Sequence, residues 1–163
     1  MSSAPSDTTC GTPAAPAASS RSGPAERVPQ VVSLGALDMV NFGPRETVPP
    51  QFEGRNLYVH NPTVTLMRTT PNECAELGRI IGRKLSGAQG PTVLFVPLKG
   101  VSMIAVEGQV FHDAEADAAL LAGLRETLDK AVEVHEVDTD INDPEFAVAM
   151  ADRLHASIEE AAT

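Results

Sequence analysis

Short strand-like runs alternate with longer amphipathic segments along most of this chain, and this alternation restricts the possible folds more than any other feature. The strand candidates are Val31–Leu34, Asn56–His60, Thr92–Val96 and Val132–Val137. Thr92–Val96 has the unbroken apolar character of a strand that is covered on both faces. Because strands separated by helices indicate crossover connections, we expect an α/β domain with a mainly parallel sheet.

The helix after the second strand candidate has the clearest local signals. Thr70 is expected to be its N-cap, Pro71 its first helical residue, and Glu73 the partner of Thr70 in a capping box. The helix should run to about Leu85. Its predicted buried face holds residues at helical spacing, namely Cys74, Leu77, Ile81 and Leu85.

Two further helices are expected downstream. The first should be capped by Asp113, and the second by Asp143 with Pro144 as its first residue. Leucines 120, 121, 124 and 128 give the first helix an apolar stripe. The stripe of the second consists of Phe146, Met150, Leu154 and Ile158.

Composition divides the chain and limits its class. Residues 1–28 are dominated by Ser, Ala, Pro, Thr and Gly, so we predict a disordered tail there and a folded domain over 29–163. The net charge of −10 argues against a nucleic-acid binder, which needs clustered cations. No apolar run is long enough for a membrane span or a signal peptide, and Cys10 and Cys74 are read as reduced thiols. We therefore expect a cytoplasmic protein with no membrane partner.

Ligands of open parallel sheets bind where the strands end, so the loops at that edge are the candidate site. They are Gly35–Gly43, Asn61–Thr70, Pro97–Gly108 and Asp138–Asn142. The sequence has no dinucleotide-binding glycine motif, and Lys99-Gly100 has the wrong order for a P-loop.

Two places in these loops can bind a small anion. Lys99, the Gly100 backbone and the Ser102 hydroxyl leave a predicted strand together. The alternative interpretation of these residues is a surface turn with a solvated lysine. Arg68 and Thr69 precede a helix N-terminus, where the helix dipole adds to the arginine charge. Capping alone also explains Thr70.

Metal ligands are harder to find in the sequence. His60, His112, His135 and His155 do not have the spacing of a zinc or iron site, so no protein-bound transition metal is expected. The oxygen-rich segment 138–143 can hold Mg²⁺ beside a phosphate, although Asp143 is more simply a helix cap.

Four separated motifs resemble one family. They are Val31–Gly43, Tyr58–Thr70, Pro97–Ser102 and Asp140–Pro144, and together they cover the chain from about residue 28 to its end. They are similar to an uncharacterised bacterial family that is related to the ATP-binding domain of the plant tomato mosaic virus resistance protein. The resemblance covers only the C-terminal half of that family.

This resemblance implies a three-layer Rossmann-like domain that forms the C-terminal lobe of a two-lobed protein and binds ATP near the lobe interface. We expect the N-terminal lobe to be absent from this chain, which would make it a truncated version. The segment Met103–Val110 departs from the pattern of the family, which usually carries an acidic residue there. In this chain Glu107 would take the place of that acidic residue.

Three functional hypotheses follow. In the first, the domain binds ATP, with or without Mg²⁺, through Lys99, Gly100, Ser102, Arg68 and Thr69, with Asp38 and Asn41 opposite. In the second, the chain is a non-catalytic interaction module, completed by a separate N-terminal-lobe polypeptide or by self-association through its first strand. In the third, it is half of an enzyme that acts on a small oxygenated acid, with His60 or His112 as the general acid–base.

Overall fold

A computed structural model describes residues 27–161 of the chain. The strands are β1 (Gln30–Ser33), β2 (Met39–Phe42), β3 (Leu57–Asn61), β4 (Val64–Arg68), β5 (Thr92–Pro97) and β6 (Glu133–Val137). The helices are α1 (Pro71–Ser86), α2 (Ala114–Thr127) and α3 (Pro144–Ala161), with short 3-10 helices η1 (Arg45–Thr47) and η2 (Pro50–Phe52). Cys10 and nearly all of the predicted disordered tail lie outside the described residues.

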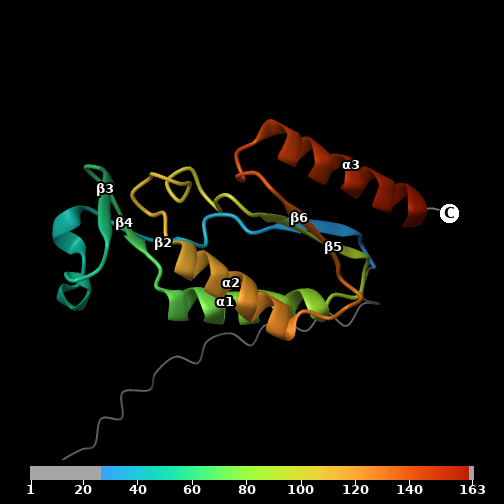
Figure 1. The fold of residues 1–163 in the computed structure, drawn as a ribbon, viewed down its shortest axis with the longest axis horizontal. Coiled ribbons are helices and arrows are strands. Elements are labelled where there is room, and N and C mark those ends of the chain that lie inside the picture. Colours follow the sequence, from blue (N-terminus) through green and yellow to red (C-terminus); the bar gives the residue numbers. More distant parts are fainter. Residues whose placement is uncertain (1–26, 162–163) are drawn as a thin grey trace, which may run out of the picture.

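The predicted parallel sheet is confirmed. Its three strands lie in the order β1-β5-β6, and both pairings are parallel. Helices α1 and α2 cover one face of this sheet and α3 covers the other, so the domain has three layers (Figure 1). One apolar core joins the sheet to α1 and α2, and a smaller one joins Val93 and Phe95 to Phe146 of α3.

The predicted helix starts are confirmed for α1 and α2. The Thr70 side chain accepts a hydrogen bond from the Glu73 backbone N–H, and the Glu73 side chain accepts one from Thr70 N–H, as a capping box requires. Asp113 caps α2 by accepting from Ala116 N–H. In α3 the predicted stripe is buried at Phe146 but 51% exposed at Ile158, so the last turn of that stripe does not belong to the core.

A second, antiparallel sheet was not predicted. Its order is β2-β4-β3, and it forms one end of the molecule (Figure 1). The predictions that Gly35–Gly43 and Asn61–Thr70 are loops are therefore wrong, because they contain β2 and β4. The strand predicted at Asn56–His60 exists, but it belongs to this hairpin and not to the parallel sheet.

The hairpin forms because Asn61 closes a tight turn. Its side-chain oxygen accepts hydrogen bonds from the N–H and the hydroxyl of Thr63, both at 2.9 Å. The strand that follows, β4, is buried over most of its length.

No helix between residues 27 and 161 combines the length and the apolar content that a membrane crossing requires.

Candidate functional site

The carboxyl ends of β1, β5 and β6 meet at one edge of the parallel sheet, and the loops that follow them are fastened together by backbone hydrogen bonds. Ala36 N–H donates to the Val101 carbonyl at 2.7 Å. Lys99 N–H donates to Thr139 and Ile141 N–H donates to Gly100, each at 3.0 Å. This edge is therefore a fixed platform and not three independent loops.

Gly100 is required where the loop after β5 turns. Its φ of +149° lies outside the range that side chains favour, and a Cβ there would lie 2.8 Å from the Val106 side chain. The turn folds residues 101–111 back over the end of the sheet. Phe111 N–H donates to the Ile104 carbonyl at 2.9 Å and closes this segment on itself.

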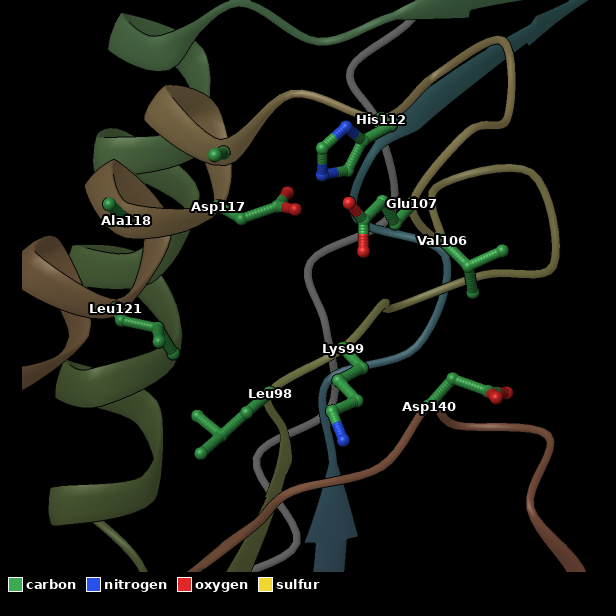
Figure 2. A pocket seen from close by; sticks show the side chains of 10 residues that line it. Leu98, Lys99, Val106, Glu107, His112, Asp117, Ala118, Leu121 and Asp140 are labelled. Carbon is green, nitrogen blue, oxygen red and sulfur yellow. The ribbon is translucent and has the colours of Figure 1, made fainter.

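A cavity of about 580 Å³ opens at this platform, between the loop after β5, the N-terminal half of α2 and the loop after β6 (Figure 2). We call it the edge cavity. Its lining combines one lysine, three carboxylates, one histidine and an apolar wall: Lys99; Glu107, Asp117 and Asp140; His112; Leu98, Val106, Ala114, Ala118 and Leu121. Its volume is in the range of sites that hold a small organic ligand.

The two ends of the edge cavity differ in chemistry. Lys99 and Leu98 lie toward one end, with Asp140 beyond them, whereas Asp117, His112 and Glu107 point toward one another at the other end (Figure 2). Lys99 Nζ pairs with Asp138 at 2.8 Å, but the two side chains are 60% and 79% exposed. A pair this exposed is weak, so the lysine remains available to an anion.

Asp117 is held by an arginine from the other sheet. Arg68 Nη2 donates to Asp117 Oδ1 at 2.8 Å, and the two side chains are 5% and 31% exposed. Burial raises the pKa of the Asp117 carboxyl above its ordinary value, and the opposing effect of Arg68 does not offset it.

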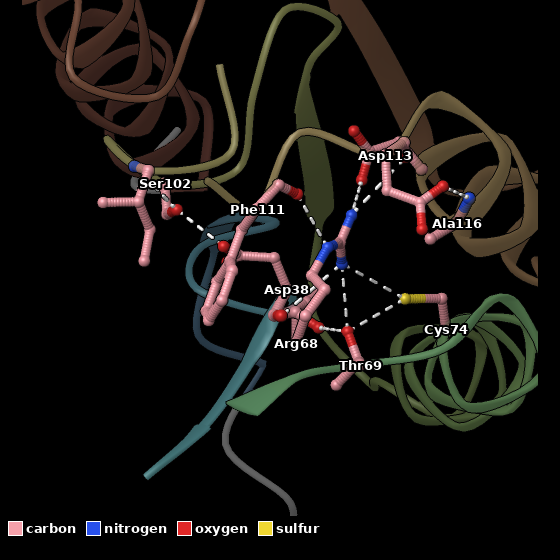
Figure 3. Close-up of polar contacts among 11 residues, drawn as sticks. Asp38, Arg68, Thr69, Cys74, Ser102, Phe111, Asp113 and Ala116 are labelled. Carbon is pink, nitrogen blue, oxygen red and sulfur yellow. Dashed lines mark hydrogen bonds and ion pairs between the residues drawn. The ribbon is translucent and has the colours of Figure 1, made fainter. Parts of the chain in front are cut away.

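Arg68 is the centre of a buried network (Figure 3). Its guanidinium donates to groups from four parts of the chain, namely the carbonyls of Phe111, Asp38 and Asp113, the Thr69 hydroxyl, the Cys74 sulfur and the Asp117 carboxylate. The strongest of these by distance are the bonds to Phe111 and Asp117, at 2.8 Å each. Thr69 donates to the Leu37 carbonyl at 2.9 Å.

Asp38 and Ser102 form a second buried pair. Ser102 Oγ donates to Asp38 Oδ2 at 2.7 Å, and Asp38 is fully buried. The other oxygen of Asp38 has no hydrogen-bond partner among the described residues. This pair ties the end of the β1 loop to the loop after β5.

The seven residues predicted to bind the cofactor are thus found in different environments. Lys99 lines the edge cavity, and Gly100 shapes the turn behind it. Arg68, Thr69, Asp38 and Ser102 are buried, with their side chains bonded mainly to one another and to the backbone. Arg68 and Thr69 also border a smaller hollow of about 280 Å³ at the start of α1. Asn41 is exposed on β2, in register with Leu66, away from the parallel sheet.

Sequence reasoning missed Asp117. It lies one helical turn after the cap residue Asp113 and one turn before Leu121, and in sequence it reads only as an acidic residue in the first turn of α2. Glu107, His112 and Asp140 were singled out, each for a separate role. Over residues 27–161 no three histidine, cysteine or acidic side chains are arranged to hold a metal ion by themselves.

The comparisons with known proteins agree with the resemblance described above. Residues 8–158 match the C-terminal domain of the uncharacterised protein family UPF0261. The chain belongs to this family. A UPF0261 protein of Clostridium tetani is 57% identical over 134 residues, and one of Rhizobium meliloti is 51% identical over 124 residues. The ToMV resistance protein Tm-1 of Solanum lycopersicum is 41% identical over 129 residues.

These UPF0261 relatives are longer proteins. The matched regions cover 82%, 75% and 78% of this chain but only 33%, 31% and 17% of the three relatives, in the same order. The chain therefore spans about a third of the length of its bacterial relatives.

Proposed function

We propose that this UPF0261 domain binds ATP together with Mg²⁺ in the edge cavity, as the C-terminal lobe of a two-lobed protein. The observation that carries the proposal is the position of Lys99. Of the described residues that line the edge cavity, it is the one lysine or arginine, and the cavity stands at the carboxyl edge of the parallel sheet, where α/β domains bind their ligands.

Phosphate groups fit the end of the cavity at Lys99. Its ammonium group is a point charge on a flexible stem and can exchange the exposed carboxylate of Asp138 for a phosphate oxygen.

Magnesium would arrive with the phosphates. Proteins commonly hold Mg²⁺ through one or two carboxylates, water and the phosphate oxygens of the nucleotide, and not through a complete cage of side chains. Asp140 and Glu107 supply carboxylates to the lining, which suits that mode. The carboxylates would otherwise repel a nucleotide, so binding should depend on the cation.

The apolar wall suits the adenine ring. Leu98, Ala118 and Leu121 line the side of the cavity that lies toward α2 (Figure 2). When an aromatic base packs against aliphatic side chains, apolar surface is buried. This burial adds to the affinity that the charged phosphates provide.

Isothermal titration of the purified chain with Mg-ATP tests this proposal. We expect binding that Lys99→Ala weakens by at least about tenfold, the effect of losing one hydrogen bond between charged groups. Lys130→Ala is the matched control, because Lys130 is an exposed lysine in the turn before β6, at the opposite edge of the sheet. No binding by the wild type, or equal binding by Lys99→Ala, would refute the proposal.

The length of the relatives favours a second candidate function, that of an interaction module. Because the chain matches only about a third of its bacterial relatives, the rest of such a protein could complete the site as a separate polypeptide or in a homo-oligomer. Light scattering of the chain alone and mixed with the N-terminal part of the Clostridium tetani protein tests this. A monomer that binds no partner would exclude it. The free, buried thiol of Cys74 suits a cytoplasmic location for either function.

A further inference from the structure

Asp117 and His112, at the end of the edge cavity opposite Lys99, have no role in the proposed function. There Asp117 points toward His112 and Glu107 (Figure 2), and among the described residues that line the cavity no lysine or arginine lies at this end. A phosphate would be repelled at this end, whereas a group that donates hydrogen bonds would be attracted. We propose that Asp117 is the specificity-determining residue of the cavity and accepts hydrogen bonds from the ribose hydroxyls of the bound nucleotide.

The first support is that one carboxylate oxygen of Asp117 is fixed. Arg68 Nη2 donates to Oδ1 at 2.8 Å from a side chain that is only 5% exposed. Arg68 cannot swing away, because its Nε also donates to the Phe111 carbonyl at 2.8 Å. Asp117 is further anchored through its backbone, whose N–H donates to the Asp113 carbonyl at 3.1 Å in the first turn of α2.

The second support is that the other oxygen is left for a ligand. Within residues 27–161, Arg68 donates to Oδ1 of Asp117 and no hydrogen bond reaches Oδ2, and the side chain, 31% exposed, lines the edge cavity. A carboxylate oxygen held at this angle accepts hydrogen bonds and can donate none while it is ionised. Arg68 is therefore a positioning residue, and Asp117 is the group that touches the ligand.

Ribose is the part of a nucleotide that fits this acceptor. Its 2′- and 3′-hydroxyls are two donors on neighbouring carbons, and the ribose that carries them joins the phosphates to the base. Acidic side chains accept from ribose hydroxyls in other α/β nucleotide sites. This inference rests on the proposed function, since it assigns the second end of the same ligand.

The experiment compares ATP with 2′,3′-dideoxy-ATP by isothermal titration, both with Mg²⁺. We expect the wild type to prefer ATP by about ten- to one-hundredfold, the range for hydrogen bonds to a charged acceptor. In Asp117→Asn the preference should fall by about tenfold or more, because a neutral amide replaces the charged acceptor that faces the ligand, and in Asp117→Ala it should fall to about one. Glu115→Gln, an equal loss of charge at an exposed position of α2 outside the cavity lining, should keep the full preference.

The ratio of the two affinities, and not either affinity alone, is the readout, because a merely structural change would weaken both nucleotides equally. Arg68→Lys should reduce the ratio without abolishing the binding of dideoxy-ATP. Inosine triphosphate, which lacks the adenine amino group, should bind within about threefold of ATP.

Each contrary outcome has a distinct meaning. If the wild type binds ATP through Lys99 but does not distinguish dideoxy-ATP, the assignment of Asp117 is wrong and the proposed function stands. If inosine triphosphate is rejected and dideoxy-ATP is not, the acceptor faces the base, and the assignment is also wrong. If ATP does not bind at all, both proposals are wrong.

Discussion

Replacement of Gly123 by alanine should destabilise the domain through the contact between α1 and α2. The two helices approach so closely that a Cβ at Gly123 would lie 2.9 Å from the carbonyl carbon of Ala75 and closer still to its oxygen. Gly78, on the facing helix, is equally confined, since a Cβ there would lie 2.7 Å from the Leu124 nitrogen. Both neighbours are helix backbone, which cannot rotate out of the way.

The expected magnitude is the difference between two effects. Alanine in place of glycine inside a helix stabilises by about 0.5–1 kcal/mol. Against this, carbon atoms pack at about 3.5 Å, so the new methyl group would overlap the Ala75 carbonyl carbon by about 0.6 Å and its oxygen by more, and it must push the helices apart. Overpacking of this kind costs about 1–3 kcal/mol or more. Since the contact is with rigid backbone, we take the upper end and expect a net loss of about 2 kcal/mol.

Thermal and urea unfolding measure this loss. A net change of about 2 kcal/mol corresponds to a fall in the melting temperature of roughly 6–10 °C for a domain of this size. Gly54→Ala is the control, because nothing lies within 4 Å of a Cβ at that position. It should change stability by no more than about 0.5 kcal/mol. A Gly123→Ala chain that melts at or above the wild-type temperature would show that the two helices are not in backbone contact.

Three other perturbations test the electrostatics and burial. Arg153 above all lowers the pKa of Glu133 from 4.5 to about 2, so the pair stabilises the fold above pH 4.5 and loses this effect as the pH falls toward 2. Glu133→Gln should remove this contribution to the pH dependence of urea unfolding. The contribution is no more than about 1 kcal/mol, because the pair is exposed. An unchanged dependence of stability on pH would contradict this prediction. Asp138→Asn should free Lys99 and strengthen Mg-ATP binding by up to about fivefold in titration calorimetry; weaker binding would show that the pair holds Lys99 in place. Burial raises the pKa of the Cys74 thiol, so Cys74 should react with iodoacetamide only when the chain unfolds. The test uses a chain in which the other cysteine is replaced by serine, and fast labelling of the folded chain would refute the prediction.

The parallel sheet and its helices could be predicted because their signals are local. Thr92–Pro97 is buried at every residue, and its unbroken apolar sequence has the pattern of a central strand. The start of α1 was equally readable, since a capping box needs only residues 70–73. In both cases the residues that carry the pattern are adjacent in the chain.

The antiparallel sheet could not be predicted in the same way. Val64–Arg68 mixes three apolar residues with Thr65 and Arg68 and follows a proline, so it was assigned to a loop, and yet all but the first of its residues are buried. Their burial depends on partners distant in sequence, such as Phe111, whose carbonyl accepts from Arg68 across 43 positions. A window of a few residues contains no trace of such a contact.

The candidate site was predicted only in part, because some of its contacts also join residues that are distant in sequence. Lys99 was found because it follows directly after a strand of the parallel sheet, where position alone suggests a ligand contact. Arg68 and Thr69 were chosen for their charge and for the helix start after them. The structure instead buries them, because six acceptors from four segments converge on Arg68 and satisfy a charge that would otherwise be costly to bury.

The position of Arg68 also explains why the two sheets belong to one functional unit. Arg68 ends β4 of the antiparallel sheet, whereas the groups it fixes, Asp117 and the Phe111 carbonyl, belong to the wall of the edge cavity and to the segment that leads into it. Removing the guanidinium would leave Asp117 without its counter-charge and several buried groups without a donor, so cavity and sheet would be disturbed together. The antiparallel sheet thus acts as a support for the wall of the cavity, although the residues that face the proposed ligand come from α2 and from the loops of the parallel sheet.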